Sequence, residues 1–554
     1  MENQPATSSS RNVLVRLWPW LVVLGVLLFV GFIRVRLLEM PLERDEGEYA
    51  YAGQLILQGI PPYELAYNMK LPGTYYAYAA GMAVFGQTIT GVHLTLLAAN
   101  SMTIILMFLL GRKLFGDIGG LVTCASYAIV SVSPSVVGLA AHATHFVVLF
   151  AVPATRLLLK ACETNRRGIL FFSGLLYGIA FLMKQQGVCF GVFGGAFLIW
   201  QAVQDRSLLS PDFAKRISIF SLGMILPFAL TCLVMALSGV FSEFWFWTFT
   251  YAKSYATAIP LPEGVRILGV SVSTTFDLCL GFWVMMAVGL PCALFNRSMR
   301  NRAAFVLFFY LCSFLGTCIG LYFRPHYFIL MIPAFALVQG MAVVSMQQVL
   351  RFKLFENVWK SLPVILFATV LSWFVFYQSL IFFQLSPVRV IENLYSWNPF
   401  VESLTVAKYI REHSPEDARI AVIGSEPQIY FYARRHSATG YIYTYALMEA
   451  QPNALKMQRQ MMQEIEAAKP EYLVYVSYGF SWNFRSGSDR AILQWFDEYA
   501  GRLYQKVGIV QLYSGGTTAG VWGEAAEKMP APGGNYIAVY QLKSDLLAAA
   551  AKAN

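Results

Sequence analysis

The sequence predicts an α-helical polytopic membrane protein with an α/β domain at its C-terminal end. The 554 residues are 57% apolar and only 13% charged, whereas soluble domains carry about 25% charged residues. The apolar residues form long runs separated by short basic loops, which is typical of helices that cross a bilayer. After Leu385 these runs give way to shorter segments of mixed polarity. We therefore expect a membrane domain at 1–385 and a second domain at 386–554.

Eleven apolar runs precede the change in polarity, and each is near the ~20 residues that a helix needs to cross the hydrocarbon. They lie at about 14–33, 88–111, 118–138, 143–160, 169–184, 187–204, 217–239, 277–295, 303–321, 327–347 and 361–383. The first run is too long for the core of a signal peptide, so we expect a retained helix. Membrane β-strands would instead alternate in polarity every second residue.

Lysine and arginine residues are unevenly divided between the loops. If alternate loops lie on opposite sides, seventeen fall on the side of the N-terminus and eight on the other. The positive-inside rule places the seventeen in the cytoplasm. We therefore expect a cytoplasmic N-terminus, with the first loop (34–87) and the C-terminal domain outside the cytoplasm. The compact loops suit a bacterial inner membrane.

Residues 386–554 carry sixteen basic and sixteen acidic side chains, so the formal charge of +10 belongs to the membrane part. That excess reflects the cytoplasmic bias, and no basic motif of a nucleic-acid-binding protein accompanies it. Strand-like segments alternate with helical ones, which predicts a small α/β domain. The strands are expected at 419–425, 472–477, 503–513 and 535–542. A single glycine at 423–426 is interpreted as a turn rather than an anion site.

The outer loops contain further helical patterns that are too short to span. Residues 47–59 and 72–85 have apolar and aromatic side chains at helical spacing, and we expect helices at the membrane surface. A dense aromatic stretch at 241–251 predicts an interfacial helix or a mobile flap. An aromatic belt is the plainer alternative.

Acidic residues are concentrated in the first outer loop. Fifteen lie in the first 385 positions, and six of those fall within 39–64. Carboxylates beside lipid are costly, so the adjacent pair Asp45 and Glu46 is a candidate functional site. The alternative is that the pair only neutralises Arg44 or Arg36. Six carboxylates exceed what such pairing requires.

Three groups on the outer face could form one site. They are the Asp45–Glu46 pair, Lys70, and Arg324 with the residues that follow it. An aspartate can take a proton from an acceptor hydroxyl, and a lysine or arginine can hold a phosphate. Nucleotide sugars and ATP are absent outside the cytoplasm, and the chain has no P-loop. These features indicate a transferase whose leaving group is a lipid phosphate. Lys184 is another possible donor contact.

Plainer interpretations stand beside this one. Lys70 could extend its ammonium to the membrane surface, and Arg324 and His326 could anchor the interface. His142 and His145 can share a helix face and a metal. More often, two such histidines are simply polar residues at a solvent-exposed helix end. The eight cysteines show no spacing typical of a metal site. No metal ligand is assigned.

The order of these motifs along the chain resembles that of the membrane-embedded C-type (GT-C) glycosyltransferases. The similar branch contains the protein O-mannosyltransferases and the lipid A aminoarabinose transferase. The similarity covers about residues 12–385. It rests on the Asp-Glu pair followed by tyrosines, Lys70-Leu-Pro-Gly-Thr-Tyr-Tyr before a surface helix, a second run that ends Gly111-Arg-Lys-Leu-Phe-Gly, and Arg324-Pro-His-Tyr-Phe-Ile-Leu-Met-Ile-Pro.

The resemblance implies an inverting transfer of a sugar from a polyprenyl-phosphate donor to an extracytoplasmic lipid, glycan or protein. It implies that Asp45 acts as the base or positions the acceptor, with Glu46 as its neighbour. Lys70 is implied as a ligand of the donor phosphate, and Arg324 is a weaker match for that role. Further substrate contacts are expected at Glu48, Tyr49, Tyr75, His326, Tyr327 and Lys184.

Glu48 departs from the family pattern, because the aminoarabinose transferase has an arginine at the apparent position. The family includes metal-independent members and members with reported metal sites. The resemblance therefore does not decide whether the protein needs a divalent metal. The polyprenyl-phosphate sugar is expected as the donor substrate, and no other cofactor is expected.

Two other functions are compatible with a membrane protein of this size. A flippase or transporter of lipid-linked sugars predicts charged residues in mid-helix and paired broken helices, whereas no Asp or Glu lies well inside a predicted span. The second is a non-catalytic assembly factor for envelope glycans. For the transferase, the expected partners are a polyprenyl-phosphate sugar, membrane lipids and an extracytoplasmic acceptor, without nucleic acid.

Overall fold

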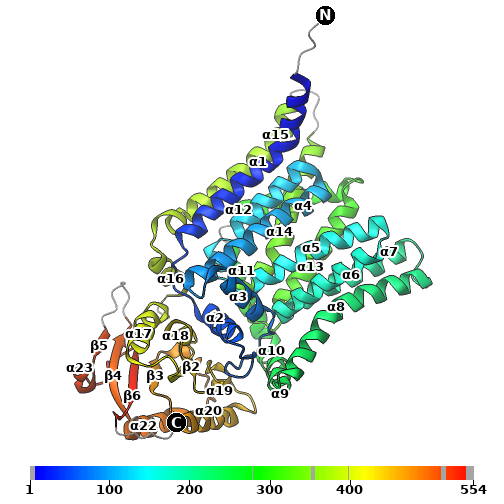
Figure 1. The fold of residues 1–554 in the computed structure, drawn as a ribbon. Coiled ribbons are helices and arrows are strands. Elements are labelled where there is room, and N and C mark those ends of the chain that lie inside the picture. Colours follow the sequence, from blue (N-terminus) through cyan, green and yellow to red (C-terminus); the bar gives the residue numbers. More distant parts are fainter. Residues whose placement is uncertain (1–6, 277–278, 351–355, 397, 513–519, 545–554) are drawn as a thin grey trace, which may run out of the picture. The chain divides into compact units, whose positions relative to one another are not determined.

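The computed structural model describes residues 7–276, 279–350, 356–396, 398–512 and 520–544, drawn in Figure 1. By packing, the described chain forms two compact units. The first contains the segments up to Arg36, Leu96–Leu230 and Ile259–Gln384. The second contains Leu37–Thr95, Thr231–Ala258 and the chain from Leu385 onward. The first outer loop thus packs with the C-terminal segment, and a domain boundary at residue 385 stays a prediction.

Long apolar helices dominate the first unit. They are α1 (Thr7–Arg36), α4 (Ile89–Val130), α5 (Ala143–Thr164), α6 (Arg167–Met183), α7 (Val188–Gln204), α8 (Pro211–Leu237), α11 (Leu261–Phe276), α12 (Leu280–Phe295), α13 (Arg300–Cys318), α14 (Ile332–Val349) and α15 (Glu356–Tyr377). Within the described ranges, eight helices are long and apolar enough to cross a membrane, or nine if the bent pair α11–α12 is one span. The chain is a multi-pass integral membrane protein.

Each of the eleven predicted runs coincides with a helix or an arm of one. The 42-residue α4 covers two of them, and Gly116 divides it at a φ of +79° that glycine adopts readily. With 17 residues, α6 is short for a crossing. The first two residues of the run at 277–295 lie outside the described residues. The number of crossings stays a prediction.

Aromatic and polar contacts join the helices of the first unit. Phe193 of α7 meets Phe305 and Phe309 of α13 edge-on, with ring centroids 5.3 and 5.0 Å apart. The hydroxyls of Thr155 on α5 and Tyr177 on α6 lie 2.8 Å apart and satisfy each other inside the apolar core.

Two helices of the first outer loop belong to the second unit, α2 (Arg44–Leu57) and α3 (Gly73–Phe85). They confirm the helices predicted at 47–59 and 72–85. The aromatic stretch forms the short helix α9 (Phe241–Trp245), which continues as the π-helical turn η3 (Phe246–Tyr251). Most of α2 is buried against other parts of this unit.

The C-terminal segment forms a mixed six-stranded sheet in the order β2-β1-β3-β6-β4-β5. Its strands are β1 (Arg419–Ile423), β2 (His436–Ser437), β3 (Tyr472–Ser477), β4 (Tyr504–Gln511), β5 (Gly520–Trp522) and β6 (Tyr536–Leu542). β1 is parallel to β2 and β3, and the remaining pairs are antiparallel. Val422, Val474 and Val539 lie side by side across the sheet and are fully buried.

The sheet and its helices confirm the predicted α/β domain. The helices include α17 (Phe400–His413), α18 (Gln428–Ala433), α20 (Ala454–Ala468) and α22 (Ala491–Leu503), with the shorter α16 (Pro387–Tyr395), α19 (Tyr445–Met448), α21 (Gly479–Trp482) and α23 (Glu524–Lys528). The four predicted strands correspond to β1, β3, β4 and β6. The sequence gives no signal for β2 and β5, because strands of two and three residues are too short to show an alternating pattern.

Candidate active site

The first turn of α2 sends its carboxylates in different directions. Glu43 is the N-cap and accepts a hydrogen bond from the backbone N–H of Glu46 (3.0 Å), whose carboxylate accepts one from the N–H of Glu43 (3.1 Å). This capping box ties up two donors at the helix start. Glu46 also lies 3.2 Å from Nε2 of His93 and has no exposed surface. Burial, together with the charges of Asp45 and Glu46, raises the pKa of Glu43 well above its usual value.

Asp45 and Glu48 converge on the ammonium of Lys70. Nζ of Lys70 lies 2.8 Å from Oδ1 of Asp45 and 2.7 Å from Oε2 of Glu48. The Lys70 side chain is 13% exposed, Asp45 is 20% exposed and Glu48 is 1% exposed. Asp45 is therefore the carboxylate of this cluster that an incoming molecule can reach. A lysine that only extended toward the membrane surface would not be buried between two carboxylates.

The charges of this cluster are mutually dependent. Burial lowers the pKa of Lys70, but the charges of Asp45 and Glu48 outweigh burial, so the net shift is upward and the ammonium is retained. Burial raises the pKa of Glu48 against the opposing effect of Lys70. Tyr75 donates a hydrogen bond of 2.6 Å to Glu48. The ammonium of Lys70 thus lies between the two carboxylates, where a metal cation bound to both would have to lie.

Tyrosine side chains surround the ammonium. The ring centroid of Tyr49 lies 4.6 Å from Nζ of Lys70, and that of Tyr443 lies 5.8 Å from it. A cation near an aromatic face is stabilised by the ring quadrupole. The hydroxyl of Tyr443 donates a hydrogen bond to Oδ1 of Asp45 at 3.1 Å. Asp45 therefore receives one bond from the first outer loop and another from the C-terminal segment.

Arg44 attaches the start of α2 to the turn after β1. It donates to the carbonyl of Ser425 (2.5 Å), to Oε1 of Glu426 (2.8 Å) and to the hydroxyl of Tyr445 (3.0 Å). The side chains of Arg44 and Glu426 are 9% and 0% exposed. The Glu426 carboxylate also accepts a bond from Ser481 (2.6 Å). The chain thus bends after β1 at a segment that binds an arginine.

Close backbone contact reinforces this attachment. A Cβ atom on Gly47 would lie 2.6 Å from the backbone nitrogen of Gln428 at the start of α18. Only a glycine between Glu46 and Glu48 lets α2 approach that closely. Further along α2, the hydroxyl of Tyr51 accepts a bond of 2.7 Å from the backbone of Ser437.

The remaining candidate residues lie in the first unit. Nζ of Lys184 lies 4.1 Å from the ring centroid of Tyr327, and the ring of His326 stacks on that of His142 at 4.3 Å. Arg324 is exposed and lies near the Tyr322 ring. The structure therefore brings Lys184 and Tyr327 together, and His326 with His142. It stays a prediction that these residues form one site with Asp45 and Lys70.

Comparison with known proteins identifies the fold. The sequence model of the dolichyl-phosphate-mannose-protein mannosyltransferase family matches residues 70–231. ArnT from Cupriavidus metallidurans, solved with undecaprenyl phosphate bound, is similar with a TM-score of 0.61 and 15% identity, over 95% of this chain and 98% of that one. This chain has the GT-C glycosyltransferase fold. A search of curated protein sequences gave no match.

A second solved GT-C structure agrees. The archaeal oligosaccharyltransferase AglB from Archaeoglobus fulgidus, in complex with an inhibitory peptide and a dolichol-phosphate, has a TM-score of 0.54 and 13% identity, over 93% of this chain and 75% of AglB. The resemblance stated from the sequence is confirmed by this fold and by the family match. That match begins at Lys70 and therefore leaves Asp45 outside it.

Tyr443, His93 and the Arg44–Glu426 pair contact the candidate residues of α2 or anchor that helix, and the sequence alone did not point to them. They meet α2 through tertiary packing, for which the sequence offers no local signal. Glu48 has such a signal, because residues three apart share a helix face, which places Asp45 and Glu48 on the same side of α2.

Proposed function

We propose that this chain is a glycosyltransferase that moves one sugar from a polyprenyl-phosphate donor to an acceptor outside the cytoplasm, with inversion at the sugar carbon. The observation that carries the proposal is the contact between the accessible carboxylate of Asp45 and the buried ammonium of Lys70 on a GT-C fold. The donor is a hexosyl or pentosyl polyprenyl phosphate.

Asp45 acts as the general base. It takes the proton of the acceptor hydroxyl as that oxygen attacks the anomeric carbon, and the carbon–oxygen bond to the phosphate breaks with its electron pair leaving on the phosphate. The Tyr443 hydroxyl and the Lys70 ammonium hold Oδ1 of Asp45 in place. A positioned acid–base group contributes about 10²–10⁴-fold to a rate.

Lys70 stabilises the charge that develops on the lipid phosphate. An ammonium has three N–H donors, and two of those of Lys70 are directed at Asp45 and Glu48. The third is available to a phosphate oxygen. Glu48 with Tyr75 orients the ammonium, and Tyr49 covers it. In this account Glu46 is a positioning residue, because its carboxylate is committed to the helix cap and to His93.

A divalent metal is the component that the sequence left open. Asp45 and Glu48 already share a lysine ammonium, so they are poorly suited to hold one. His142 and His326 are two imidazoles in contact, and a metal at this pair would need further ligands. We propose that Arg324 and Lys184 assist the donor phosphate instead. Transfer that is unchanged by EDTA would support this assignment, and transfer restored only by an added divalent ion would contradict it.

We place the N-terminus in the cytoplasm and the C-terminal domain outside it, in a bacterial inner membrane, on the strength of the uneven distribution of basic residues. Labelling single introduced cysteines with a membrane-impermeant reagent tests this orientation. A cysteine at Ser488 should react from outside the cell, and a cysteine at Ser210 should not. The reverse pattern would contradict it.

Two assays separate a transferase from the rival functions. Purified protein in detergent is incubated with radiolabelled polyprenyl-phosphate sugars and a crude envelope extract. Label that moves from lipid to extract establishes a transferase. A flippase would leave the label on the lipid and would move that lipid across the bilayer of a reconstituted vesicle. An assembly factor would do neither.

A further inference from the structure

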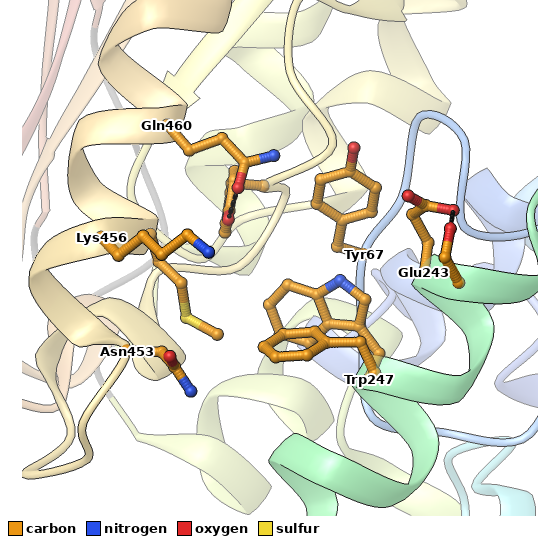
Figure 2. Close-up of a pocket in the computed structure, with 10 residues that line it drawn as sticks. Tyr67, Glu243, Trp247, Asn453, Lys456 and Gln460 are labelled. Atoms are coloured by element: carbon orange, nitrogen blue, oxygen red, sulfur yellow. Dashed lines mark hydrogen bonds between the residues drawn. The ribbon is translucent and has the colours of Figure 1, made fainter.

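A cavity of about 230 Å³ lies in the second unit, apart from the cluster of Asp45 and Lys70. Figure 2 shows its walls: Tyr67 from the first outer loop, Glu243 and Trp247 from α9 and η3, and three side chains from α20 and its N-cap. Those three are Asn453, Lys456 and Gln460. The volume is below the ~300–1,000 Å³ of sites for drug-sized ligands. The cavity is large enough for a single six-membered ring with its substituents.

One wall of the cavity is aromatic and rigid. The rings of Tyr67 and Trp247 are stacked with centroids 5.6 Å apart, and Tyr441 meets both edge-on. The backbone N–H of Tyr67 donates to the carbonyl of Gly440 at 2.6 Å. The Tyr441 hydroxyl donates to Gln460 at 2.9 Å. This wall is therefore fixed before any ligand arrives, which lowers the ordering cost of binding.

Hydrogen-bond donors and acceptors line the cavity beside the aromatic wall. The indole N–H of Trp247, the hydroxyl of Tyr67 and the ammonium of Lys456 have no hydrogen-bond partner among the described residues. The carboxylate of Glu243, which accepts a bond from Ser242 (2.5 Å), supplies acceptor oxygens. Hydroxyl groups both donate and accept hydrogen bonds. A ligand with several hydroxyls around an apolar ring face matches this arrangement.

The charges of the cavity argue against other ligand classes. Lys456 and Glu243 carry opposite charges, so the cavity has no net attraction for a phosphate. An apolar ligand would leave the donors of Trp247, Tyr67 and Lys456 unpaired, which costs about 1–3 kcal/mol for the buried indole of Trp247. A sugar ring satisfies both the aromatic wall and the polar groups.

We propose that this cavity is a saccharide subsite that holds one sugar unit of the acceptor. The inference rests on the proposed glycosyltransferase function. Tyr67 is three residues from Lys70, so their backbones are at most about 11 Å apart. A glycan with one unit in the cavity would thus keep its neighbouring unit near Asp45. The acceptor is then a glycan or glycolipid rather than an unmodified protein.

Direct binding to the full-length protein in detergent tests the subsite without any transfer. The probes are maltotriose, chitotriose and mannotriose, and binding is measured by saturation-transfer NMR and calorimetry. At least one probe should bind, and Trp247→Ala and Lys456→Ala should each weaken its binding at least tenfold. Lys456 is exposed, so its variant should fold even if the variant of the buried Trp247 does not.

Matched controls come from the same helices. Trp245 is exposed on α9 and Arg459 is exposed on α20, and neither lines the cavity. Trp245→Ala and Arg459→Ala should bind the probe as the wild type does. Absence of binding by all three probes, or binding that Lys456→Ala leaves unchanged, would overturn the subsite.

The transfer assay separates this proposal from the one it rests on. In an active enzyme, Lys456→Ala should raise the KM for the acceptor severalfold and leave the KM for the donor unchanged. An acceptor KM equal to that of the wild type would overturn the subsite while leaving the transferase in place. Probe binding by a protein that transfers nothing would support a saccharide site and contradict the transferase.

Discussion

The hydroxyl of Tyr443 donates a hydrogen bond to Oδ1 of Asp45, at 3.1 Å and across 398 residues of the chain. The same oxygen accepts a bond from Lys70 at 2.8 Å. Two donors from different segments thus fix the carboxylate to which the proposal assigns proton transfer. The C-terminal segment contributes a side chain to the reaction site through this contact.

Tyr443→Phe removes one of the two bonds to Asp45. Hydrogen bonds to charged groups contribute about 1.5–3 kcal/mol, so we expect kcat to fall about 10–100-fold. The melting temperature should change little, because the ring and its packing remain. Tyr76→Phe, on an exposed tyrosine of α3, is the matched control and should leave kcat unchanged. An unaltered kcat in Tyr443→Phe would remove Tyr443 from the site.

Lys70→Ala should mainly weaken use of the donor. Loss of the ammonium removes the ligand of the lipid phosphate, so the donor KM should rise at least tenfold while the acceptor KM changes less. Removing one partner of a buried ion pair also costs about 3–5 kcal/mol of stability. The double variant Lys70→Met with Glu48→Gln removes one charge of each sign and should fold better. A donor dependence equal to that of the wild type in either variant would exclude Lys70 as a phosphate ligand.

Arg44 and Glu426 should behave as a coupled pair in unfolding. Either Arg44→Met or Glu426→Gln leaves a buried charge or donor without its partner and should cost about 3–5 kcal/mol. The double variant should cost clearly less than the two single costs added together. Thermal unfolding of the four proteins in detergent measures this coupling. Strictly additive losses would contradict an energetic link between α2 and the turn after β1.

Glu402 should make stability depend on pH. Burial, with the charge of Glu392, raises the pKa of Glu402 to about 7. The native state therefore holds this proton more tightly than the unfolded state does, and stability falls as pH rises from about 4.5 to about 7. Glu402→Gln should be more stable than the wild type at pH 8, by up to about 3 kcal/mol, and equally stable at pH 4.

Glu412→Gln is the control for this pH dependence, because Glu412 is half exposed on the same helix. Its melting temperature should follow that of the wild type at both pH values. If Glu402→Gln also follows the wild type at pH 8, the buried carboxylate does not titrate in this range.

The local patterns of the sequence predicted the helices, the sheet and the acidic cluster. Asp45, Glu48 and Lys70 lie within 26 residues and share one short loop-and-helix segment, so composition alone drew attention to them. The adjacent pair Asp45–Glu46 suggested a shared role. Successive residues of an α-helix point about 100° apart, and the capping box turns Glu46 away from the cluster.

Long-range packing limited what could be predicted. Nothing local to Tyr443 or Glu426 indicates that they contact Asp45 and Arg44, because these contacts depend on how the C-terminal segment packs on α2. The glycine at position 47 was part of a helical pattern in the sequence. The structure explains why this position is a glycine, because a side chain there would collide with the backbone of Gln428.

The most direct measurement compares Asp45→Asn with Glu46→Gln and the wild type in the transfer assay with radiolabelled polyprenyl-phosphate sugars. All three proteins are first checked for folding by thermal unfolding. We expect Asp45→Asn to fold normally and to lose at least 100-fold in transfer, whereas Glu46→Gln should lose stability and retain measurable transfer. Transfer by Asp45→Asn at the wild-type rate would contradict Asp45 as the base.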